Sequence, residues 1–125
     1  MILGIGLDIV PIARVAALLE RHGARAEQRL FSRIERADCE ARAEPAQHYA
    51  ARFAAKEALR KALGGPPGLR WVEIEIHTTD AGRPVLILSG AAAVAAADRG
   101  VAAQHVSLTH AGGMAAAVVV LEGAT

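Results

Sequence analysis

The change in hydrophobic period along the chain restricts its fold more than any other feature. In "RWVEIEIH", at 70–77, Val72, Ile74 and Ile76 alternate with polar or aromatic residues, which predicts a half-buried strand. The turn sequence "DAGRP" follows, and "VLILS" at 85–89 is the expected antiparallel partner. The second half of the chain therefore contains at least one β-hairpin.

The other segments predict four helices and three more strands. Pro11 suits the first turn of a helix, "SRIE" has the form of a capping box, and "GGPPG" ends a long Ala-rich helix. The expected helices span 11–22, 33–42, 45–63 and 90–98, and the additional strands span 2–10, 104–110 and 114–122. This order predicts an α+β fold, in which a small antiparallel sheet packs against helices, and not a βαβ alternation.

The length of 125 residues indicates a single domain, 1–125. Hydrophobic residues make up 53% of the chain, but only four residues are aromatic, so much of the apolar content is alanine. Alanine buries little area per residue. An oligomer that covers additional surface would suit this composition.

The charge and the cysteine content indicate which cellular compartment and which classes of partner suit this chain. The net charge of +1 by itself says nothing about nucleic acid, because nucleic-acid-binding surfaces are local basic patches, usually on a strongly basic domain. We expect no nucleic-acid partner. Cys39 has no second cysteine to pair with, which favours a reducing compartment. The chain has no apolar run of membrane-spanning length and no signal-peptide pattern at its start. We therefore expect a cytoplasmic protein that does not bind a membrane.

The segment 14–36 is nevertheless locally basic. Its basic residues are Arg14, Arg21, Arg25, Arg29, Arg33 and Arg36, and its acidic residues are Glu20, Glu27 and Glu35. An acidic partner could dock on this surface.

Both lysines of the chain lie in "FAAKEALRK", at 53–61. Glu57 and Lys61 are four residues apart and share one face of the expected helix, whereas Lys56 is turned by about 100° from Glu57. A surface salt bridge would explain such a pair. A site for magnesium and phosphate would also explain it, because magnesium is held by one or two carboxylates and lysine supplies charge to phosphate oxygens.

Asp8 places a carboxylate inside an apolar strand, between Leu7 and Ile9. An unpaired charge in that position would be costly, so Asp8 needs a partner. It could face water, cap the following helix, or bind a metal ion together with Glu57.

Alternation within "HVSLTH" sends His105, Ser107 and Thr109 to one face of a strand and His110 to the other. The two histidines are therefore poor candidates for one shared metal site. The remaining histidines, His22, His48 and His77, are expected to be surface residues.

Four motifs together resemble the short bacterial class of 4′-phosphopantetheinyl transferases, the holo-[acyl-carrier-protein] synthases. They are "GIGLDIV", "RFAAKEALRKALG", "GRPVL" and "HVSLTHAGGMAAAVVVLE", and they span nearly the whole chain. Each motif alone is weak, but their order in a chain of this length is specific. The resemblance implies the fold of that family and a homotrimer with sites between subunits.

The resemblance also implies a reaction. The phosphopantetheine arm of coenzyme A is moved onto a serine of apo-acyl carrier protein, with magnesium, and adenosine 3′,5′-bisphosphate is released. The reaction serves fatty acid biosynthesis.

The family pattern assigns roles to individual residues. It implies that Asp8 and Glu57 bind magnesium, that Lys61 holds pyrophosphate oxygens, and that Lys56 is a coenzyme A contact or a support. It further implies that Arg52, Pro84 and His105 line the coenzyme A site, with Ser107 a weaker member. Arg14 and Arg21 are expected to dock the acidic carrier.

Two questions stay open at the level of sequence. The base that removes the serine proton is either Glu57 or a metal-bound water or hydroxide. A coenzyme A-binding protein without turnover, or a purely structural oligomer, would be the alternative to an enzyme.

The loop "GGPPGLRW" departs from the hydroxyl-containing loop that relatives often carry, which puts a phosphate contact from that loop in doubt.

Overall fold

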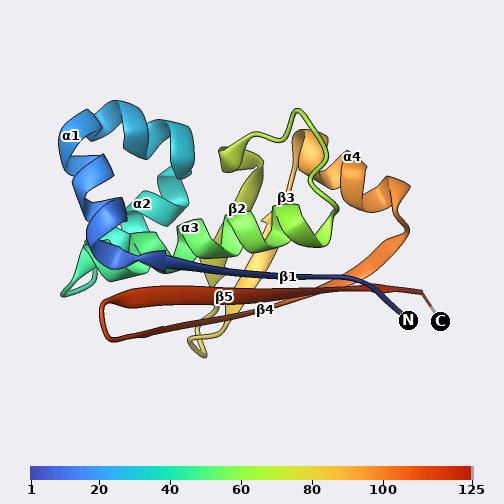
Figure 1. Ribbon diagram of the computed structural model, residues 1–125. Coiled ribbons are helices and arrows are strands. Elements are labelled where there is room, and N and C mark those ends of the chain that lie inside the picture. The colour runs from blue at the N-terminus through green and yellow to red at the C-terminus, as the bar shows by residue number, and fades with distance from the viewer. Residues whose placement is uncertain (125) are drawn as a thin grey trace.

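The computed structural model describes residues 1–124 and has an α+β fold, as predicted (Figure 1). The strands are β1 (Ile2–Pro11), β2 (Ile74–Thr78), β3 (Pro84–Leu88), β4 (Val101–Ala111) and β5 (Met114–Gly123). The helices are α1 (Ile12–Leu30), α2 (Arg33–Glu40), α3 (Pro45–Ala62), the 3₁₀ turn η1 (Trp71–Glu73) and α4 (Gly90–Asp98). The strands form two antiparallel sheets, β1-β5-β4 and β2-β3, instead of one.

Helix α1 is longer than predicted. Gly23 has φ 57° and ψ −139°, which interrupts the helix, but the chain then continues as a second helical arm to Leu30. A glycine at the end of an apolar helical pattern usually marks a helix end, and here it marks a sharp bend. Figure 1 shows the two arms of α1 folded into an arch beside α2.

The strand predicted at 70–77 begins only at Ile74, because residues 71–73 form a 3₁₀ turn. The Glu73 carboxylate holds this turn by accepting hydrogen bonds from the backbone N–H groups of Arg70 and Ala91, each at 2.9 Å. The inward alternation within β2 is as expected, since Ile74 and Ile76 are each 1% exposed.

Helix α3 packs unusually close to β1 because Gly4 and Gly6 face it without side chains. A Cβ atom at Gly6 would overlap the carbonyl oxygen of Ala58, and one at Gly4 would overlap that of Ala62. The adjacent strand β5 presents small or branched residues to the same helix, with Ala115, Ala117, Val119 and Leu121 all buried. This close approach places Asp8, the next inward-facing position of β1, against the last turns of α3.

The other face of the three-stranded sheet has no helix over it in the described part of the chain (Figure 1). Ile5, Leu7 and Ile9 point outward there and are 62%, 64% and 62% exposed. Their partners in β5, from Ala116 to Val120, continue this apolar surface. We call this surface the outer sheet face.

Candidate active site

Asp8 finds its partner in Lys61. The ammonium nitrogen of Lys61 lies 3.0 Å from Asp8 Oδ1 and donates a second hydrogen bond, also 3.0 Å, to the Leu7 carbonyl oxygen. The Asp8 side chain is 17% exposed and that of Lys61 is 53% exposed, so the pair lies at the surface and is open to a ligand.

Glu57 lies one turn before Lys61 on α3 and is partly exposed. Within residues 1–124 its carboxylate takes part in no ion pair, unlike that of Asp8. No cluster of three or more metal-ligating side chains occurs among the described residues. Asp8 on β1 and Glu57 on α3 are both partly exposed, and one or two carboxylates are enough for magnesium, which retains water molecules and substrate phosphates among its ligands.

Lys56 does not reach this surface, because its side chain is completely buried. Its ammonium donates hydrogen bonds to Glu35 at 2.7 Å and to the backbone carbonyl oxygens of Trp71 and Ile74. The second oxygen of Glu35 accepts a 3.0 Å hydrogen bond from Ile76 N–H. Of the two roles considered for Lys56, the geometry matches a support that joins α2, α3 and β2, and the side chain is not open to coenzyme A.

Arg52, Pro84 and Ser107 come together around a cavity of about 460 Å³, which we call the basic pocket. Sequence reasoning did not identify the other basic residues that line it, Arg42, Arg83 and His48. Arg83 belongs to the turn "DAGRP", whose residues are explained by turn formation, so only the folded chain reveals its position.

Asp38 organises the arginines of the basic pocket. Its carboxylate forms ion pairs with Arg42 and Arg52 and accepts a hydrogen bond from the Thr78 hydroxyl. Burial alone would raise the pKa of Asp38, but the charges of Arg52 and Arg42 outweigh it and hold that pKa below its usual value. Arg52 Nε is buried and, within residues 1–124, has no hydrogen-bond partner.

His105 is close to the basic pocket in sequence but does not line it in this chain. The register of β4 and β5 puts His105 opposite Val120, on the outer sheet face, as the alternation predicted. Its imidazole Nε2 lies 2.9 Å from Glu122 Oε1, and both side chains are largely exposed.

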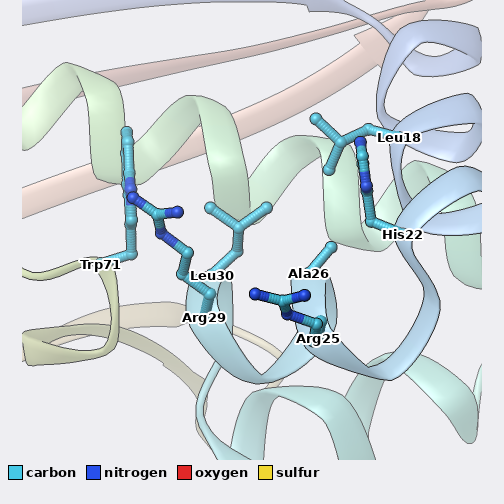
Figure 2. Close-up of a pocket in the computed structure, with 7 residues that line it drawn as sticks. All are labelled: Leu18, His22, Arg25, Ala26, Arg29, Leu30 and Trp71. Carbon is cyan, nitrogen blue, oxygen red and sulfur yellow. The ribbon is translucent and has the colours of Figure 1, made fainter.

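Arg14 and Arg21 lie exposed on the first arm of α1 and line one groove together with Leu18 and His22. An adjoining cavity of about 570 Å³ lies between this arm and Trp71, and Figure 2 shows Leu30 and Ala26 between them. Arg25 and Arg29 stand along the same cavity. The surface of α1 therefore combines apolar and positively charged groups.

The comparisons with known proteins identify the family to which this chain belongs. Residues 4–119 match the profile of the 4′-phosphopantetheinyl transferase superfamily. The holo-[acyl-carrier-protein] synthase of Anaeromyxobacter dehalogenans is 53% identical over an alignment that covers 99% of this chain and 98% of the relative.

Two solved structures extend the similarity to the fold. Mycobacterium tuberculosis acyl carrier protein synthase has a TM-score of 0.80 and 38% identity, over 99% of this chain and 100% of that chain. Helicobacter pylori holo-[acyl-carrier-protein] synthase, in complex with coenzyme A, has a TM-score of 0.83 and 31% identity, over 94% of this chain and 99% of that chain. This chain therefore belongs to the 4′-phosphopantetheinyl transferase superfamily and, within it, is an enzyme of the holo-[acyl-carrier-protein] synthase family.

Proposed function

We propose that this enzyme transfers the 4′-phosphopantetheine group of coenzyme A to a serine of apo-acyl carrier protein, with Mg²⁺ as cofactor. The observation that carries the proposal is the pairing of Lys61 with Asp8, one turn of α3 after Glu57, whose carboxylate forms no ion pair within residues 1–124. The test is incubation with apo-carrier, coenzyme A and magnesium, followed by the mass of the carrier.

The basic pocket binds the phosphate groups of coenzyme A in this proposal. Arg42, Arg52 and Arg83 line the pocket and supply positive charge. Arginine suits phosphate because its planar donors form two parallel hydrogen bonds. Pro84 and Ser107 contribute the uncharged wall of the pocket.

Asp8 and Glu57 are the residues that would hold magnesium. When bound, magnesium supplies charge neutralisation for the pyrophosphate as charge develops on it. Lys61 adds a compact ammonium at the same surface, where it stabilises the leaving phosphate oxygens.

The transfer forms a bond between the serine oxygen and the phosphorus that carries pantetheine, and it breaks the bond from that phosphorus to the bridging pyrophosphate oxygen. Adenosine 3′,5′-bisphosphate leaves with that oxygen. The serine proton must go to a base. We assign this role to Glu57, acting directly or through a water that it holds, because its carboxylate forms no ion pair within residues 1–124.

The enzyme acts as a homotrimer in this proposal, with sites between subunits. Arg52 and Glu57 are five residues apart on α3, so their side chains point about 140° away from each other. One chain therefore presents the basic pocket and the carboxylates on different sides, and a neighbouring copy would bring the two halves together. The apolar outer sheet face, which also carries His105 and Ser107, is the surface on which copies would meet.

The acidic carrier docks on α1, where Arg14 and Arg21 are exposed next to Leu18. Opposite charges at such a rim speed association and fix orientation more than they add affinity.

In residues 1–124, no helix has both the length and the hydropathy that crossing a bilayer requires. We place the single-domain enzyme in fatty acid biosynthesis in the cytoplasm.

A further inference from the structure

His48 lies one turn before Arg52 on α3 and lines the basic pocket. The sequence predicted a plain surface residue, but the side chain is half-buried. Its ring approaches that of His110 on β4 edge to face, with ring centroids 6.5 Å apart. Histidine is the side chain whose ordinary pKa lies nearest neutral pH, so its charge responds to what shares the pocket.

The groups that face His48 are mostly positive. Arg42 comes from the segment between α2 and α3, Arg52 from α3 and His110 from β4, while Arg83 lines the pocket from the β2–β3 turn. Asp38 on α2 is the acid near the ring, and its carboxylate is already paired with Arg42 and Arg52.

These surroundings disfavour the imidazolium form. Burial of the ring, followed by the charges of Arg42, Arg52 and His110, lowers the pKa of His48, and Asp38 opposes this only in part. Without a bound anion, the imidazole is therefore neutral at pH 7. A dianionic phosphate beside it would reverse the balance, because an opposite charge favours the protonated ring.

We propose that His48 takes up a proton when a phosphate group of coenzyme A, or of its product adenosine 3′,5′-bisphosphate, enters the basic pocket. The protonated ring then adds its charge to those of the three arginines. This inference rests on the proposed function, because it requires the basic pocket to be the phosphate-binding site. It makes ligand affinity depend on pH through a residue outside the Asp8, Glu57 and Lys61 group.

The direction of the effect follows from linkage. The complex binds more protons at His48 than the free enzyme does, so this residue strengthens binding as the pH falls through the region of an ordinary histidine pKa. The phosphate group itself has a pKa near 6, and its protonation weakens binding over the same range. The contribution of His48 must therefore be isolated by comparison with a variant.

The experiment is calorimetric titration of the full-length protein with adenosine 3′,5′-bisphosphate, from pH 5.5 to pH 8, in buffers with different ionisation enthalpies. The proteins are wild type, His48→Gln and, as a matched loss of one imidazole on β2 away from the pocket lining, His77→Gln. We expect wild type to take up more protons than His48→Gln near pH 6. We also expect its affinity advantage over His48→Gln to reach about tenfold at pH 5.5 and to vanish by pH 8. His77→Gln should bind the bisphosphate and take up protons as wild type does.

The variant Arg83→Gln distinguishes a failure of the His48 inference from a failure of the pocket assignment. If this variant binds the bisphosphate about tenfold or more weakly and His48→Gln keeps the proton uptake of wild type, the inference is wrong and the pocket assignment stands. If Arg83→Gln binds like wild type, or if wild type does not bind the bisphosphate at all, the pocket assignment in the proposed function fails and the inference fails with it.

Discussion

The ammonium of Lys61 lies 3.0 Å from Asp8 Oδ1 and so joins the middle of β1 to the last turn of α3. The contact exists because Gly4 and Gly6 let the two elements approach at backbone distance. Packing of the core and placement of the reactive groups therefore share one cause. Lys56, on the same helix, points instead into the interior.

Replacing Lys56 by methionine should therefore lower mainly the stability of the protein, and replacing Lys61 should lower mainly the rate of transfer. Lys56→Met leaves the buried charge of Glu35 without its partner, and we expect the free energy of unfolding to fall by about 3–5 kcal/mol. Lys61→Met removes an exposed pair worth at most about 1 kcal/mol, but transfer should slow by about 100-fold or more. Urea unfolding and the rate of carrier modification measure the two effects. Equal stability losses, or a fully active Lys61→Met, would refute this division.

Asp38 should make stability depend on acid pH. Its pKa is lower in the folded protein than in the unfolded chain, so below the ordinary value the unfolded chain binds more protons and stability falls. The contribution is complete above about pH 4 and is lost as the pH falls through the folded pKa.

Urea midpoints between pH 5 and pH 2.5 measure this dependence. Asp38→Asn should have a shallower slope than wild type, whereas Asp98→Asn, at the exposed end of α4, should keep the wild-type slope. Identical slopes for all three proteins would show that the ion pairs of Asp38 with arginine do not contribute to the pH dependence of stability.

Arg14 and Arg21 should act on carrier association. We expect Arg14→Ala/Arg21→Ala to raise KM for the carrier about tenfold at low ionic strength and to leave kcat within about twofold. The difference from wild type should shrink as salt is added, because exposed charges are screened. Arg33→Ala, an exposed arginine on α2, is the matched control. A drop in kcat with unchanged KM would show that these arginines act in the transfer step and not in carrier association.

The outer sheet face should hold the trimer together. In a single chain this face is a large exposed apolar surface, and Leu7→Asp puts a charge at its centre. We expect light scattering to report monomers for this variant and a trimer for wild type and for Val94→Asp, which alters an equally exposed residue of α4. A wild-type monomer, or a trimeric Leu7→Asp, would contradict the proposed assembly.

Local pattern predicted most elements of this fold and part of its site. The alternation in β2, the capping box of Ser32 and Glu35, and the outward placement of His105 and Ser107 all follow from periods and spacings within a few residues. The second arm of α1 was missed because Gly23 is equally compatible with an end and a bend.

The remaining features depend on contacts between distant segments. Helical spacing puts Lys56 and Lys61 on different faces of α3, but only the fold shows that Lys56 is buried against Glu35 and that Lys61 pairs with Asp8 at the surface. Likewise, Arg42, Arg83 and His48 belong to a loop, a turn and a helix, and only tertiary structure gathers them around one pocket. Such sites are fixed by packing, which sequence periodicity does not encode.

The central claim is tested most directly by intact mass spectrometry of the carrier. Apo-acyl carrier protein is incubated with the enzyme, coenzyme A and magnesium, in parallel with Glu57→Gln and with an excess of chelator. The account predicts a mass gain equal to one phosphopantetheine group, which disappears in both controls. No gain with several carriers, although coenzyme A binds, would contradict it and would leave a binding protein without turnover.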